Sequence, residues 1–253
     1  MHLTAGGKSE PLPPWSYPVE LRLSEETSSA RWIEERLATY PWATVGAIVP
    51  EGFEAYARIL HPAYLKDGSN EKPVTWASVA ALRGKQTHPL VQFNRLTDLG
   101  DDPDRDPPGM NRPREGVPPE EVLQPLVGVL KELTPMTPEC WFCLWAGFGQ
   151  LETLIGFDDA PRVEIPGREY LLFSGALNAI DGFRARNNWG DDGPNIWWPE
   201  DRAWCVATEI DLDSTYVGGS GELIESLGDE DALEVMPARL EDGVSINSDT
   251  INT

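Results

Sequence analysis

The sequence predicts an α+β fold, with a mostly antiparallel sheet in the second half of the chain and helices packed against it. Two observations support this prediction. Helical and strand-like patterns alternate in the first half of the chain, whereas short strand patterns dominate the second half. Antiparallel connections suit this order better than βαβ crossovers do, which favours α+β over a doubly wound parallel sheet.

Three helices are predicted from apolar spacing and from capping residues. The first lies between residues 27 and 41. The second spans residues 76–83, because Thr75 can cap its start and Gly84 can end it. The third spans residues 118–133 and carries carboxylates in its first turn, where they are favourable. Its expected buried face consists of Val122, Leu126, Val129 and Leu133.

Strands are predicted where apolar residues alternate with polar ones or form short runs. The segment 204–212 is the most regular of them. Segments 162–165 and 169–174 are expected to form a hairpin around Pro166 and Gly167. The other predicted strands cover residues 18–23, 53–59, 140–146 and 233–236, and a short helix is expected at 222–227 after a glycine turn.

The domain organisation follows from composition along the chain. Residues 1–15 are polar and proline-rich and are expected to form a mobile arm. Residues 16–241 are predicted to form a single α+β domain that contains an acidic, Pro/Gly-rich segment at 99–118. This segment is a loop or a linker. Residues 242–253 are polar and are predicted to be a disordered tail.

The strongly acidic charge of the chain bears on its partners. The formal net charge is −22, which repels phosphate backbones and anionic membrane surfaces, so we expect neither nucleic-acid nor membrane binding. The charge serves either solubility or the binding of a basic protein partner. No apolar signal segment is visible at the start of the chain, and three cysteines make no disulfide scaffold. A cytoplasmic location is therefore predicted, and the oligomeric state stays open.

The cysteines and histidines are expected to be structural. Cys140 and Cys143 form a CxxC motif, which serves redox or zinc sites in other settings. Here the motif lies in an aromatic strand pattern, so the two side chains would point to opposite faces. His61 and His88 each precede a proline, and nothing nearby supports a catalytic role. We expect no catalytic constellation, no bound metal and no cofactor.

Three carboxylates are spaced two residues apart in the predicted strand 204–212 and just after it. Period-two spacing would place Glu209, Asp211 and Asp213 on one face. Such a face could hold Mg²⁺ or Ca²⁺, or could supply a general acid and base. The alternative is a solvated sheet face in an acid-rich protein. These residues and the nearby Tyr216 are candidate binding residues.

A tryptophan-rich segment is the most unusual stretch of the chain. Trp189, Trp197 and Trp198 lie within ten residues, and Arg202 follows them as a candidate for stacking on an indole ring. Tryptophan concentrates both in cores and at binding hot spots. The segment is therefore either a lid over the core or a recognition surface, and all four residues are candidate binding residues.

Two resemblances bear on the function. The stretch WPEDRAWCVATEIDLDSTYVGGS at 198–220, with GFEAYAR at 52–58 and REYLLF at 168–173, resembles a signature of uncharacterised actinobacterial proteins, over roughly residues 40–227. That resemblance implies no activity. The general layout is also similar to the SUKH superfamily, many members of which are immunity proteins that bind toxins. This likeness implies an α+β binding module without catalytic residues.

The sequence thus favours a non-catalytic, cytoplasmic protein-binding function, of an immunity-like kind. The acidic charge, the tryptophan-rich segment and the lack of a recognisable catalytic motif support this hypothesis. The alternative is a small-molecule or metal-dependent enzyme that uses Glu209, Asp211 and Asp213.

Overall fold

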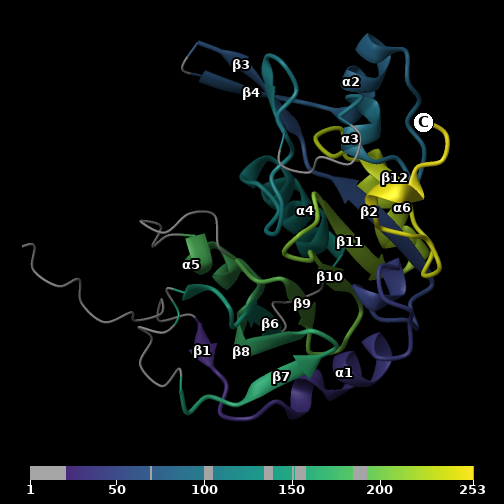
Figure 1. The fold of residues 1–253 in the computed structure, drawn as a ribbon. Coiled ribbons are helices and arrows are strands. Elements are labelled where there is room, and N and C mark those ends of the chain that lie inside the picture. The colour runs from purple at the N-terminus through teal and green to yellow at the C-terminus, as the bar shows by residue number, and fades with distance from the viewer. Residues whose placement is uncertain are drawn as a thin grey trace, which may run out of the picture.

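The computed structural model of the protein describes residues 21–68, 70–99, 105–133, 139–149, 151, 158–184 and 193–252. Helices and antiparallel sheets occur together in these residues, which confirms the α+β class. One large sheet runs through the body, and helices lie on both of its sides (Figure 1). The mobile arm predicted at residues 1–15 lies outside the described residues.

The large sheet contains nine strands, and all of their pairings are antiparallel. The order along the sheet is β1-β8-β6-β9-β10-β11-β2-β12, and β7 also pairs with β8. Their bounds are β1 (Arg22–Leu23), β2 (Ala55–Leu60), β6 (Glu139–Trp145), β7 (Arg162–Ile165), β8 (Arg168–Ala176), β9 (Ile196–Pro199), β10 (Cys205–Ala207), β11 (Ser214–Gly219) and β12 (Val235–Pro237). The predicted hairpin at 162–174 and the edge strand near 235 are confirmed.

The sheet is buried on both faces. Successive side chains of a strand point to opposite sides, so neighbouring residues enter different apolar clusters. Helices α4 (Glu120–Leu133) and α6 (Gly221–Asp229) cover one face, together with the short α5 (Asp181–Arg184) and the 3₁₀ turn before it. Helix α1 (Arg31–Leu37) and a 3₁₀ turn at Val45–Ala47 cover the other face.

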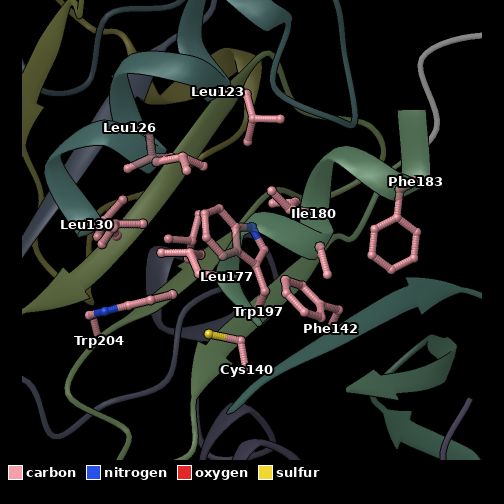
Figure 2. Close-up of a cluster of buried hydrophobic side chains, with 14 of the residues drawn as sticks. Leu123, Leu126, Leu130, Cys140, Phe142, Leu177, Ile180, Phe183, Trp197 and Trp204 are labelled. Atoms are coloured by element: carbon pink, nitrogen blue, oxygen red, sulfur yellow. The ribbon is translucent and has the colours of Figure 1, made fainter. Parts of the chain in front are cut away.

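Helix α4 supplies much of the first cluster. Its leucines point at Trp197 of β9 and its neighbours in Figure 2. The predicted face is confirmed for Val122, Leu126 and Val129, whereas Leu133 is 36% exposed because it lies in the last turn, beyond the sheet. None of the described helices has the length and apolar character that a membrane crossing requires.

Helix α2 (Trp76–Arg83) has the bounds that its capping residues predict. The Thr75 hydroxyl accepts a hydrogen bond from the Ser78 N–H, and Gly84 ends the helix at φ 67°. Next to it lie α3 (Phe93–Leu96) and a small sheet in the order β4-β3-β5, built from β3 (Ala63–Asp67), β4 (Asn70–Val74) and β5 (Met110–Asn111). The β3–β4 hairpin projects from the body in Figure 1.

The described part of the acidic segment at 99–118 contacts the rest of the domain. Met110 and Val117 are each only 7% exposed, and β5 pairs with β3. The Gly116 N–H donates to the Leu212 carbonyl at 2.9 Å. Composition alone did not predict these contacts, because a few buried residues and one short pairing are enough to fix the segment.

The C-terminal segment at 242–252 corrects the predicted disordered tail. Its start pairs with residues 43–45, and Asp249 and Asn252 are 2% and 5% exposed. The Asp249 carboxylate accepts hydrogen bonds from the N–H groups of Gln92, Ile251 and Asn252, and its Oδ1 lies 3.0 Å from His88 Nε2. The segment is fixed by hydrogen bonds to one carboxylate, and a composition argument cannot detect such an arrangement.

Asp249→Ala should loosen the C-terminal segment. Burial alone would raise the pKa of Asp249, but hydrogen bonds from Asn252 and from backbone N–H groups outweigh it and lower this pKa. Removing the carboxylate leaves several buried donors unpaired, so we expect a loss of about 1–3 kcal/mol in the free energy of unfolding. Urea unfolding measures this loss, and limited proteolysis should cut the segment faster. The exposed Asp231, changed to alanine, is the matched control; equal effects of the two changes would contradict the assignment.

Candidate functional site

The three spaced carboxylates do not share a strand face. The strand predicted at 204–212 is wrong: β10 ends at Ala207, a turn follows, and β11 returns from Ser214. Ala207 pairs with Tyr216, so Glu209 and Asp211 lie in the connection between two antiparallel strands. The alternating pattern continues through the connection, which is why it imitates one long strand.

Glu209 and Asp211 bind one arginine. The Arg168 Nε lies 2.8 Å from Glu209 Oε1, and its Nη2 lies 2.8 Å from Asp211 Oδ2. The guanidinium also stacks on the Trp145 ring, with its carbon 5.9 Å from the ring centroid. Both carboxylates are thus paired with the one β8 guanidinium, which cancels only one of their two charges. In the part of the chain that the structure describes, no group of three His, Cys, Asp or Glu residues could hold a metal ion.

Asp213 points away from that pair and joins a buried polar group. Its Oδ1 lies 3.9 Å from Arg58 Nη2. Burial raises the pKa of Asp213, while Arg58 and Arg112 lower it less. The Arg58 side chain is 4% exposed, donates to Ser214 Oγ at 3.0 Å and to the Val91 carbonyl at 2.7 Å, and stacks on an indole ring. This arrangement links β2, β11 and the segment before α3.

His61 is the centre of a second buried chain of hydrogen bonds. Its Nδ1 lies 2.7 Å from the Arg114 carbonyl, which can only accept, so Nδ1 carries the proton. The neutral ring then accepts at Nε2 from the Thr215 hydroxyl at 2.9 Å, and Thr215 lies 2.7 Å from Thr208. Burial lowers the pKa of His61 to about 4. His61 thus links the end of β2, β11 and the segment before α4 through buried hydrogen bonds.

The buried His61 should make the stability depend on pH. The unfolded chain protonates this ring near pH 6.5, whereas the folded chain keeps it neutral down to about pH 4. The unfolded state therefore binds more protons in this window, and stability is lost as pH falls from 6.5 to 4, by on the order of 3 kcal/mol. Chemical unfolding of the wild type and His61→Gln across this window measures the difference. Identical pH slopes for the two proteins would contradict this role.

The cysteines are core residues. All three are free and buried. Cys140 faces the cluster under α4, and Cys143 faces the cluster under α1, as the strand geometry predicts. Burial raises the pKa of Cys140 to about 12 and raises those of Cys143 and Cys205 as well. A thiolate, which both redox chemistry and metal binding require, is thus strongly disfavoured.

The tryptophan-rich segment is also core where the structure describes it. Trp197 and Trp198 are 0% and 1% exposed, on opposite faces of β9, and Tyr216 is 2% exposed. No partner can reach these three side chains. Trp189 lies outside the described residues. Arg202 does stack on an indole, but the ring belongs to Trp32 of α1.

An exposed surface beside the β7–β8 turn was not predicted. Pro166 and Gly167 form this turn; Gly167 has φ 81°, which glycine adopts without strain. Trp42 lies next to the turn, 69% exposed, with a ring atom 3.8 Å from where a Gly167 Cβ would be. Ala43, directly after it, has φ 63°, a strained value for alanine.

An open groove of about 610 Å³ lies on the other side of the same turn. Its lining includes Trp145, Ile165 and Arg168, and the last two also line the small hollow at Trp42. We call the residues that share this region the hairpin surface: Trp42, Trp145, Glu164, Ile165, Arg168 and Glu169. Apart from Trp42, little in the sequence indicates the hairpin surface, because its residues come from three segments that are far apart in the chain.

Two glutamates of the hairpin surface lack a countercharge. Glu164 and Glu169 stand directly opposite each other on β7 and β8, and both are exposed. Like charges in this position repel. Within the described residues neither has a cation within 4 Å, because the nearby Arg168 binds Glu209 and Asp211 instead. The groove, which Arg162 and Arg168 also line, therefore contains two carboxylates that form no ion pair within the described residues.

The outer edge of β7 is closed to strand pairing. The Glu164 N–H, which points away from β8, donates to Glu34 Oε1 of α1 at 2.9 Å. This bond occupies the outward N–H of Glu164, so a further strand cannot use it for pairing. Comparison of the chain with protein-family models, with curated proteins and with solved structures finds no match.

Proposed function

We propose that this protein is a non-catalytic binding protein, and that the hairpin surface docks a basic protein partner. One observation carries the proposal: the exposed Trp42, directly before the strained Ala43, lies at the β7–β8 turn, and on the other side of this turn lies a groove with two carboxylates that form no ion pair in the described residues. An exposed tryptophan beside a groove is a typical hot-spot anchor. The carboxylates add complementarity to lysine or arginine side chains.

The overall charge supports the same partner class. A net charge of −22 favours basic over acidic protein partners. Three free, buried cysteines suit a reducing compartment, so the proposed location is the cytoplasm. The SUKH likeness implies an immunity-like function with a toxin as the partner. We propose this as the more specific binding function.

Trp42→Ala should abolish or strongly weaken partner binding while the fold stays intact. Loss of a hot-spot tryptophan costs at least about 2 kcal/mol of binding free energy, or roughly 30-fold in Kd. Affinity capture from the source cell identifies the basic partner, and calorimetry with the purified partner measures Kd for each variant. Leu82→Ala is the control, because Leu82 is 76% exposed on α2, away from the hairpin surface. A Trp42→Ala protein that binds as tightly as the wild type would refute the docking surface.

Neutralising the glutamate pair should slow association. The double change Glu164→Gln and Glu169→Gln removes two charges without changing shape, so we expect an association rate lower by about two- to tenfold and a weaker dependence on salt. Stopped-flow or surface-based kinetics at several salt concentrations measures both. The double change Glu120→Gln and Glu132→Gln, at exposed positions on α4, controls for net charge. If that control slows association equally, the groove carboxylates have no specific role.

A further inference from the structure

Two guanidinium groups stack on one indole ring of α1, and none of these three residues belongs to the hairpin surface. The guanidinium carbons of Arg36 and Arg202 lie 5.3 Å and 5.2 Å from the Trp32 ring centroid. The ring itself is held edge-on by Trp198, at 5.8 Å and 83°, and by Phe53. We call these three residues, Arg36, Trp32 and Arg202, the Trp32 stack.

Arg202 is held in an unfavourable backbone conformation by a turn in which its N–H donates to the Pro199 carbonyl at 2.8 Å. Its φ is 58°, in the left-handed region that suits glycine. The side chain is exposed, and within the described residues its guanidinium makes the stacking contact but no hydrogen bond or ion pair. A guanidinium carries five N–H donors, so Arg202 presents a full set of unused donors.

Arg36 is half-buried and also lacks a carboxylate partner in the described residues. Its Nη1 donates to the Glu51 carbonyl at 2.6 Å. Gly52, at φ 106°, leaves room for it, since a Cβ there would lie 2.6 Å from the same nitrogen. The chain thus makes space for this guanidinium but supplies no negative charge.

The neighbouring carboxylates are directed elsewhere. Glu51 accepts from the Tyr40 hydroxyl at 3.1 Å, and Asp201 accepts from the Ala203 N–H at 3.0 Å. The buried Trp32 Nε1 also has no acceptor. In a chain with 42 acidic and 20 basic residues, the Trp32 stack is therefore rich in donors and poor in acceptors.

We propose that the Trp32 stack is a binding site for a small oxyanion, a phosphate or carboxylate group, held by the guanidinium groups of Arg36 and Arg202. The planar donor fork of arginine matches such groups and binds them through two parallel hydrogen bonds. Stacking on the fixed Trp32 ring orients the fork before the anion arrives. Interactions with charges more than about 8 Å away are screened at physiological salt, so the local donors outweigh the distant acidic surface. The site is independent of the hairpin surface.

The test is a titration of the full chain at constant ionic strength with inorganic phosphate, with succinate and with chloride. The indole N–H resonance of Trp32 in ¹H–¹⁵N spectra reports binding. We expect a saturable shift with phosphate or with succinate but not with chloride, and the arm that shifts identifies the oxyanion class. Arg202→Gly should weaken that affinity by at least about tenfold, because the fork is lost. Glycine adopts φ 58° without strain, so this variant folds.

Two further variants make the result specific. Arg202→Lys keeps the charge and loses the planar fork, so its affinity should fall between those of the wild type and Arg202→Gly. Arg83→Ala removes an exposed arginine on α2 and should leave the affinity unchanged. If the Trp32 resonance stays in place with both phosphate and succinate, or if Arg202→Gly binds as tightly as the wild type, the proposal is overturned. The proposed binding of a protein partner through Trp42 does not depend on the outcome of this titration.

Discussion

Burial of the large sheet on both faces is the constraint on which the rest of the structure depends. Because side chains alternate between two apolar clusters, each central strand is apolar at most of its positions. This explains why Trp197 and Trp198, or Cys140 and Cys143, lie close in sequence yet in different clusters. The residues that most resemble functional motifs in the sequence are thus used for packing. Function is left to side chains at the rim, where the sheet ends.

Polar side chains inside the buried sheet are tolerated only where they have hydrogen-bond or ion-pair partners. These bonds fix the connections between the strands. Arg58 and Asp213 join β2 to the start of β11, and His61 joins β2 to the segment that precedes α4. A buried charge or ring without such partners would cost several kcal/mol. The connection 208–213 is therefore fixed from both ends: Asp213 binds inward, while Glu209 and Asp211 bind Arg168 at the surface.

Sequence reasoning succeeded where the physical signal is local. The caps of α2 and the turn at Pro166–Gly167 depend on a few adjacent residues, so both follow from the sequence. It failed where the local conformation depends on contacts with residues that are distant in the sequence. The strand 204–212 breaks because the chain turns back to pair Ala207 with Tyr216, and the C-terminal segment is ordered by Asp249 reaching residues near 90. The hairpin surface could not be assembled from sequence for the same reason, since only tertiary structure brings Trp42 to the β7–β8 turn.

The distribution of paired and unpaired charges says more about function than their sum. Several buried or half-buried charges in the described residues have an ion-pair partner, as Arg58 and Arg168 illustrate. Within the described residues, two places combine charges that have no ion-pair partner with an aromatic ring: a glutamate pair near an exposed tryptophan, and two arginines over a buried one. Both adjoin a non-glycine residue at positive φ, Ala43 in one case and Arg202 in the other. Backbone strain at an uncompensated charge lowers stability without improving packing, and proteins retain such costs chiefly at sites that bind something.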